Sequence, residues 1–510
     1  MFLSSRQNRC FLLIACLLCI NICSCSSSNV TITPAPTPTP IYTLSHGGAC
    51  VQLGAHPHPP YPNVQVSHDH YLAHSEPMLA EDPENPLHLV GGSKFFTNRE
   101  HYQFQIGYYA SFDGGCTWID GGVLPGFKSG TLTSDPSFAF GPHNTVYAAT
   151  LNAGAAATGS KTGISVWTSK DGGKTFGPPV SVFTDETGRI FNDKPWIAVD
   201  HTAGPHSGSI YVVWSYDHGA SCGGAGYCQQ ELAFSRSTDG AKTFSPVQLI
   251  EGQAPFCTDS VPGRAKSSTA CDEAIGATPV VGPDGALAVA FAYEDPINSN
   301  VPTLMLVTTS SDGGTTWTAP MWVATAHDII GTFPPEKYRV ASLPTFACDP
   351  RTGQLYLAWA DKGKHDADIL LTTSTDHGRT WSAVTRVNDD SPQNGANQFQ
   401  PQLAVAPDGV VSVSFFDTRV DPQHKFLDVY LAQSIDHGTS FLANVRATSQ
   451  SWDPAVKAPT DENGLQFIGD YQGLAADNAF AHPFWNDTRT GDQQIFTAAV
   501  PSVQPNTEHK

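Results

Sequence analysis

The chain has 510 residues, of which only 15% are charged, and its formal net charge is −20 at pH 7. An acidic surface repels phosphate backbones, which argues against nucleic acid as a partner. No glycine-rich phosphate loop of the G-x-x-x-x-G-K-[ST] type occurs, so nucleotide chemistry has no support either. With 45 Gly and 39 Pro, turn-rich β structure is favoured over long helices.

The N-terminal 25 residues are typical of an export signal. Arg6 and Arg9 precede the apolar run Phe11–Ile22, which is too short to span a membrane. Ser24 and Cys25 then follow in a pattern that resembles a bacterial lipobox, in which Cys25 would carry the lipid. The alternative is an ordinary secretory signal that is cut nearby. Either way we expect an extracytoplasmic protein, cell-surface or secreted, that meets a membrane only through a lipid anchor.

Residues 26–63 form a Ser/Thr/Pro-rich linker followed by a segment rich in His and Pro. The linker includes the run Pro34–Pro40, which reads PAPTPTP. Such a composition stays extended and solvated. It would hold a folded domain away from the membrane surface.

Cysteine spacing also fits an exported protein. Cys222 and Cys228 flank a short Gly-rich loop and are expected to form a disulfide, and Cys257 and Cys271 could close another. An odd number of cysteines follows the signal, so at least one thiol stays free, and Cys348 is the candidate. The spacings match no zinc ribbon.

One octapeptide, of the form S-x-D-x-[GA]-x-[ST]-[WF], is repeated along the chain. Its Asp and Ser can cap backbone N–H groups, its Gly can take a positive φ, and the aromatic residue can pack inward, so each copy predicts a hairpin turn. A repeat interval of roughly 60 to 70 residues indicates repeated supersecondary units. The six copies are Ser111–Trp118, Ser169–Phe176, Ser237–Phe244, Ser310–Trp317, Ser374–Trp381 and Ser434–Phe441.

A pair of apolar strands precedes each octapeptide, and a seventh pair has no octapeptide after it. Seven pairs predict an all-β fold, a single propeller with seven blades over residues 64–500, followed by a polar tail at 501–510. The last blade would take its outer strand from the stretch near Val64–Val66, which would remove exposed sheet edges. Six blades remain the alternative, and we expect a monomer. The pairs lie at 76–92, 135–150, 194–215, 273–291, 343–361, 400–417 and 470–487.

The six octapeptides resemble the Asp-box (BNR) repeats of the sialidase superfamily, over about residues 75–500. The resemblance implies a propeller whose boxes lie on the face opposite the site. It also implies an exported glycoside hydrolase that acts on terminal sialic acid or a related acidic sugar of glycans. Two alternatives stay open: a non-catalytic cell-surface propeller that binds glycans or proteins, and a glycosidase or lyase that acts on another polysaccharide through paired carboxylates.

In such a propeller, innermost strands begin, and second strands end, on the face that carries the site. Polar residues at strand starts are Glu76, Asp135, Asp193, Glu273, Gln400, Asp470 and Tyr471. Those after second strands are Arg99, Glu100, Asp217, Glu294, Asp295, Asp361, Asp417, Arg419, Asp487 and Arg489.

The resemblance implies a tyrosine nucleophile paired with a carboxylate. Tyr471 is the candidate nucleophile and Glu273 its candidate partner, with Asp135 as a further catalytic acid. The alternative for Tyr471 is a ring packed at the mouth of the channel. In the family an arginine usually stands near the first strand, but here the matching stretch is Ser75-Glu76-Pro77.

The resemblance also implies an arginine clamp for a sugar carboxylate. Arg99, Arg419 and Arg489 would supply it from blades one, six and seven, since the guanidinium fork binds a carboxylate bidentately. The alternative is that Arg419 pairs with Asp417, and Arg489 with Asp487, as a repeated structural salt bridge.

Two parts of the sequence contain residue types that can bind a metal. His68-Asp69-His70 could ligate a metal, and the acidic strand starts could hold Ca²⁺. Prolines around the His-rich segment favour a solvated stretch instead. We expect no metal and no cofactor.

Overall fold

The computed structural model describes residues 59–503 apart from 72, 99–102, 129, 155–160, 219–229, 259–268, 295–301, 330, 334–335, 364 and 462–463. The predictions for Cys25, Arg99 and the Cys222–Cys228 pair, and those for the export signal and most of the linker, therefore lie outside the described residues.

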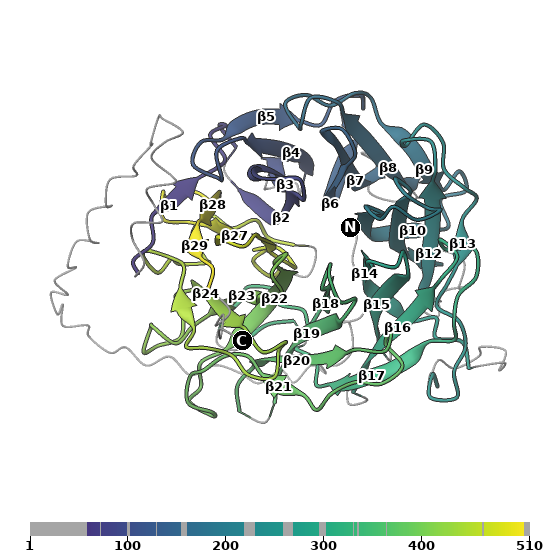
Figure 1. Ribbon diagram of the computed structural model, residues 1–510. Helices are drawn as coiled ribbons and strands as arrows, with labels where there is room; N and C mark the ends of the chain where they lie inside the picture. Colours follow the sequence, from purple (N-terminus) through teal and green to yellow (C-terminus); the bar gives the residue numbers. More distant parts are fainter. Residues whose placement is uncertain are drawn as a thin grey trace, which may run out of the picture.

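Seven antiparallel sheets are arranged in a ring, so the prediction of an all-β propeller with seven blades is confirmed (Figure 1). Six blades have four consecutive strands each, and the innermost strand comes first in the chain. Blade one comprises β2 (His74–Asp82), β3 (Asn85–Asn98), β4 (Gln103–Ser111) and β5 (Ile119–Val123). Blade two comprises β6 (Leu132–Gly141), β7 (Thr145–Ala153), β8 (Thr162–Ser169) and β9 (Val180–Thr184). Blade three comprises β10 (Phe191–Val199), β11 (Ile210–Asp217), β12 (Gln230–Ser237) and β13 (Gln248–Leu249).

Blade four comprises β14 (Ala274–Val281), β15 (Leu287–Tyr293), β16 (Thr303–Ser310) and β17 (Met321–Ala326). Blade five comprises β18 (Thr345–Cys348), β19 (Leu355–Asp361), β20 (Asp368–Ser374) and β21 (Thr385–Arg386). Blade six comprises β22 (Gln398–Val405), β23 (Val411–Asp417), β24 (Asp428–Ser434) and β25 (Val445–Arg446). Among the described residues, no helix is long and apolar enough to cross a membrane.

The seventh blade joins the two ends of the described chain. It contains β26 (Gly473–Ala476), β27 (Phe480–Asp487) and β28 (Gln494–Ala498), with the short β29 (Val500–Pro501) beside β27. Its outer strand is β1 (Asn63–Gln65), which pairs antiparallel with β28, as the sequence predicted (Figure 1). The ring is therefore closed by the N-terminal strand, and the blade is not left with an open edge.

Large aromatic side chains fill the space within and between the blades. Trp214, Trp359 and Trp485 lie on the second strands of blades three, five and seven, and all three are fully buried. Each indole brings a large apolar area to the interface between sheets. The continuous apolar runs along the second strands thus reflect burial on both faces.

Each octapeptide forms the same turn at the end of a third strand. In the first, the Ser111 hydroxyl donates to Asp113, and the Gly115 N–H donates to Ser111. The Thr117 N–H and hydroxyl both donate to the carboxylate of Asp113. Third strands run parallel to first strands, so these turns lie at the end of the blade opposite the innermost strand starts. The interpretation of the octapeptide as a structural turn is confirmed.

The cysteine predictions that can be checked are confirmed. Cys257 and Cys271 form a disulfide. Cys348 is the free cysteine among the described residues, and burial raises the pKa of its thiol to about 12. This thiol therefore stays protonated and unreactive.

We expect Asp312→Ala to lower the free energy of unfolding by about 1–2 kcal/mol, as loss of a capping acceptor does elsewhere. Asp312 accepts hydrogen bonds from the Thr316 hydroxyl and N–H, which lower its pKa to about 2. Urea unfolding measures the change, and Ser311→Ala at the exposed neighbour is the control. An unchanged midpoint would contradict the structural role of the turn.

Candidate functional site

Bulges in the innermost strands shape the centre of the ring. The β2, β6, β10 and β22 strands each lose register with their partner near their start. In each, a residue that directly precedes proline has a positive φ, which is unfavourable for a residue with a side chain. These residues, with φ in degrees, are Glu76 (53), Asp135 (54), Lys194 (49) and Gln400 (50).

All four bulged residues are buried, and their side chains contact other blades. The Lys194 ammonium reaches Asp470 of blade seven, and the Gln400 amide donates to the Gly469 carbonyl. Glu76 accepts a hydrogen bond from Ser134 of blade two. The bulges thus bring side chains from separate blades into one polar cluster, which we call the central cluster.

Asp470 is the most strongly bound member of the central cluster. Its carboxylate accepts hydrogen bonds from Lys194 Nζ at 2.7 Å and from Arg339 Nε and Nη2 at 3.0 and 2.7 Å. Burial alone would raise the pKa of Asp470, but the charges of Arg339 and Lys194 lower it below its ordinary value. Asp470 is therefore an anion that two buried cations hold in place.

Two other carboxyl groups of the cluster are shifted in the opposite direction. Burial raises the pKa of Glu76 to about 7, although Lys94, with its Nζ 3.5 Å from Glu76 Oε2, opposes the shift. Burial also raises the pKa of Asp193 to about 7, against the nearby charge of Lys194. Near neutral pH both groups can release and take up protons, which suits acid–base catalysis.

The central cluster lines a recess at the end of the ring where the innermost strands begin. Its volume is about 410 Å³ with the open mouth included, but the enclosed part is only about 20 Å³. That is room for about one water molecule. The lining residues are Glu76, Lys94, Phe104, Leu132, Ser134, Asp135, Leu151, Ala153, Phe191, Asp193, Lys194 and Arg339.

Tyr471 lies beside this recess and is buried. Its hydroxyl donates to Asp135 Oδ1 at 3.4 Å, and its ring packs edge-on against Trp196 at 5.5 Å between centroids. Burial, and then the charge of Asp135, raises the pKa of Tyr471 well above 10. The structure thus brings Tyr471 and Asp135 together. The Tyr471 ring is also packed against its neighbours, as the structural alternative for this residue predicts.

The predicted pairing of Tyr471 with Glu273 was wrong. Glu273 precedes β14 in blade four, and its backbone forms a parallel bridge with Gln230 of blade three. The hydroxyl of Tyr471 is directed instead to Asp135, because the bulge in β6 turns that carboxylate toward blade seven.

The expectation that Arg419 and Arg489 form a clamp beside Tyr471 was also wrong. Arg419 Nε donates to Asp417 Oδ2 at 2.7 Å, and Arg489 Nε donates to Asp487 Oδ2 at 2.8 Å. Neither arginine lines the recess. Each guanidinium is held by the carboxylate two residues before it, as in the salt-bridge alternative.

The aromatic and amide contacts of these arginines lie farther out in their blades. Arg419 stacks on Tyr430 of β24, and Arg489 stacks on Phe496 of β28. Arg489 Nη1 also donates to Asn63 Oδ1 of β1 at 2.7 Å. This arginine therefore helps to hold the strand that closes the ring.

The cations that do line the recess are Lys94, Lys194 and Arg339, none of which the sequence analysis selected. Lys194 had a signal, since it precedes Pro195 just as Glu76 and Asp135 precede their prolines. Arg339 lies in the connection between β17 and β18, outside the strand pairs and the octapeptides. Lys94 lies inside β3, where its Nζ stands 4.1 Å from the centroid of the Phe104 ring.

His68, Asp69 and His70 do not form a group of metal ligands in the described part of the chain. The Asp69 carboxylate accepts the Tyr71 N–H and bonds to His74 Nε2 at 3.1 Å. The histidine that hydrogen-bonds to Asp69 is therefore His74, not His68 or His70.

No family model matches the sequence, and no curated protein matches it. Solved structures with similar folds include a Hadza microbial sialidase, at 15% identity over 78% of this chain and 73% of the other, with a TM-score of 0.42. An α-L-arabinofuranosidase of Fusarium graminearum matches at 17% identity over 69% and 92%, with a TM-score of 0.45. A phage phi92 endosialidase matches at 9% identity over 88% and 70%, with a TM-score of 0.48. These similarities do not assign the chain to a family.

We expect the stability of the protein to fall between about pH 4.5 and pH 7. The folded state holds a proton on Glu76 that the unfolded chain releases near the ordinary pKa of 4.5, so rising pH favours unfolding up to the folded pKa of about 7. Glu76→Gln removes this titration and should make the decline less steep. Asp193, Glu81, Glu251 and Asp417, whose pKa values burial also raises, supply the remainder. Urea unfolding from pH 4 to pH 8 measures both slopes.

Glu84→Gln, at an exposed position in the turn after β2, is the control and should leave the slope unchanged. Equal slopes in the wild type and Glu76→Gln would show that Glu76 ionises in the folded protein as it does in water.

Proposed function

We propose that the protein is an exported, sialidase-like glycoside hydrolase that releases a terminal acidic sugar from glycans. The observation that carries the proposal is the central cluster, which combines two carboxyl groups that titrate near pH 7, a Tyr–Asp pair and three cations around one recess. Groups shifted in this way are typical of catalytic sites.

The cations supply a reason to expect an anionic sugar. Lys94, Lys194 and Arg339 line the recess of a chain whose net charge is −20, so positive charge is concentrated where the overall surface is negative. A sugar carboxylate would share Arg339 and Lys194 with Asp470. The role given to Arg419 and Arg489 by the sequence thus passes to different residues.

The chemistry follows from the protonation states of the cluster. Glu76 or Asp193 in its protonated form would donate a proton to the glycosidic oxygen as the sugar–oxygen bond breaks. Tyr471 would attack the anomeric carbon while its phenolic proton passes to Asp135, the acceptor of its hydrogen bond. Water then attacks the anomeric carbon and gives a proton to the ionised Glu76 or Asp193. The bond between the sugar and Tyr471 breaks, and the proton on Asp135 returns to the tyrosine oxygen.

The enclosed volume of about 20 Å³ sets a condition on this proposal. A sugar ring does not fit in that space, so Phe104, Leu132, Leu151 or Phe191 at the lining must move when substrate enters. The strained backbone at Glu76 and Asp135 supports a site, because such strain persists chiefly at functional positions.

A second function is favoured by the burial of Asp470. Its hydrogen bonds to Lys194 and Arg339 connect blade three, blade seven and the β17–β18 connection. Such a cluster can serve to lock the centre of the ring. The protein would then be a non-catalytic propeller that binds glycans or proteins through its surface.

Hydrolysis of a fluorogenic sialoside separates the two functions. We expect the wild type to release the fluorophore, with kcat/KM falling as pH rises through about 7, where the acid loses its proton. Tyr471→Phe and Glu76→Gln should each reduce kcat by about 100-fold or more in protein that is still folded, as judged by a cooperative thermal transition. Arg489→Gln is the control and should lower the Tm while the activity of the folded protein is kept.

An inactive wild type, folded as judged by its Tm and tested on sialosides and arabinosides, would favour the non-catalytic propeller. Equal activity of Tyr471→Phe and the wild type would overturn the nucleophile, and loss of activity in Arg489→Gln at an unchanged Tm would restore the arginine clamp.

We also propose that Cys25 carries a lipid that anchors the protein outside the cytoplasm. The lipobox-like Ile22–Cys25 supports this, and the Pro-rich linker after it provides a spacer. Cys25→Ser should shift the protein from the membrane fraction to the soluble fraction, as measured by fractionation and immunoblot. Unchanged membrane association in the variant would overturn the anchor.

A further inference from the structure

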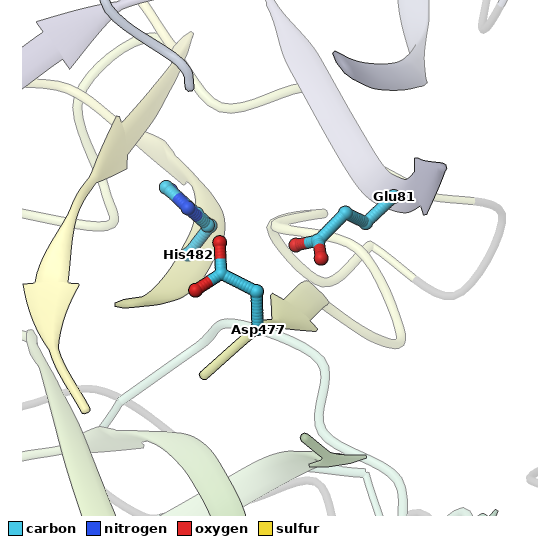
Figure 2. Close-up of side chains that lie close together, drawn as sticks. All are labelled: Glu81, Asp477 and His482. Atoms are coloured by element: carbon cyan, nitrogen blue, oxygen red, sulfur yellow. The ribbon is translucent and has the colours of Figure 1, made fainter. Parts of the chain in front are cut away.

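A second polar group lies at the other end of the innermost strands, away from the central cluster. Glu81 is near the end of β2 in blade one, Asp477 follows β26 in blade seven, and His482 is on β27. One ligand atom from each lies within 4.8 Å of those of the other two. Figure 2 shows the two carboxylates and the imidazole directed toward a common space.

His482 is buried without any hydrogen bond from its ring. It is 1% exposed, and neither ring nitrogen has a partner. Glu81 Oε2 is likewise buried and has no partner. Unpaired buried polar atoms are costly, and a ring nitrogen that nothing satisfies calls for a ligand.

His88 shows what a purely structural histidine does in a comparable place. It lies near the start of the second strand of blade one, as His482 does in blade seven, and it is 2% exposed. Its Nε2 bonds to the Gly172 carbonyl of the next blade at 2.8 Å, and its Nδ1 bonds to Asp82 at 3.3 Å. His482 has neither kind of partner, although the turn of the next blade lies close, at Gly115.

We propose that Glu81, Asp477 and His482 form a binding site for a divalent transition-metal ion, with Zn²⁺ the best match. Two carboxylates and one imidazole are a ligand set that borderline ions accept, whereas Ca²⁺ prefers oxygen alone. Three protein ligands leave a position for water. Ligands about 2.0–2.2 Å from zinc lie roughly 3.5 Å from one another, so the side chains close by about 1 Å on binding.

Charge supports the same assignment. The carboxylates of Glu81 and Asp477 lie close together, and no cation makes a salt bridge with either in the described part of the chain. A dication would neutralise this pair and satisfy the imidazole at once.

The position of the site gives it a structural consequence. Glu81 belongs to the first blade and the other two ligands to the last, so a bound ion would connect the blades that meet where the ring closes. The β1–β28 pairing joins the segment before β2 to the same last blade, at its outer edge. Metal binding would therefore raise the stability of the closed ring.

The test uses the full exported chain, stripped with EDTA and then titrated with Zn²⁺. Calorimetry and metal analysis after gel filtration measure the stoichiometry, and the Tm is followed with and without Zn²⁺. Because other histidines, such as His68 and His70, can also take up zinc, the quantity that decides is the difference between the wild type and His482→Leu. We expect the wild type to bind one more equivalent and to gain several degrees in Tm.

Asp477→Asn should lower the zinc affinity at least tenfold, and His88→Gln is the matched control that should keep the equivalent. His482→Leu should fold in EDTA with a Tm no lower than that of the stripped wild type, because no hydrogen bond is lost. Equal zinc stoichiometry and equal Tm gains in the wild type and His482→Leu would overturn the proposal. So would a Ca²⁺ affinity that exceeds that for Zn²⁺ at this site.

Discussion

Closure of the ring is the constraint on which the rest of the structure depends. Each blade buries both of its faces against neighbours, so a break at any seam would expose two apolar sheets and an unpaired edge. The pairing of Asn63–Gln65 with β28 gives the last blade its outer strand and joins the two ends of the described chain. Every contact across the centre of the ring presupposes this closure.

The same hydrogen-bonded set of aspartate, arginine and asparagine recurs in blades six and seven. It explains how the short strand β1 is held. In blade six, Arg419 is bound to Asp417 and donates to Asn444, whose amide donates to the Val387 carbonyl of blade five. In blade seven the equivalent Arg489 donates to Asn63, whose amide donates to the Ala447 carbonyl of blade six. β1 thus takes the place of a fourth strand in detail, although it comes from the opposite end of the sequence.

The sequence predicted the fold well because the fold is repetitive. Six octapeptides and seven strand pairs are local patterns whose hydrogen bonds lie within a few residues, as between Ser111 and Thr117. The strand starts were also predicted to share one face, and Glu76, Asp135, Asp193 and Asp470 do interact there.

What could not be predicted was the partner of each side chain. The Asp–x–Arg motif is the same whether the guanidinium points to its own aspartate or into a cavity, and only the packing on Tyr430 or Phe496 decides. Arg339 belongs to a connection between blades, outside the repeated strand pairs and octapeptides, so the repeat pattern could not reveal it.

Backbone strain accompanies the polar groups at the centre of the ring. Ordinary strand geometry could bring opposite charges into contact there without that strain. Here Glu76, Asp135 and Lys194 adopt a positive φ immediately before proline, a conformation that costs of order 1–3 kcal/mol at each residue. The ion pairs only partly offset this conformational free energy. Burial leaves Glu76 and Asp193 with pKa values near 7 and so removes part of their charge at neutral pH. Gln400 has the same conformation although it cannot titrate, so the strain belongs to the bulge of the fold, and the raised pKa values of Glu76 and Asp193 are what support proton transfer at this cluster. For the hydrolase proposed above, substrate chemistry is therefore to be sought at the recess, which Arg419 and Arg489 do not line.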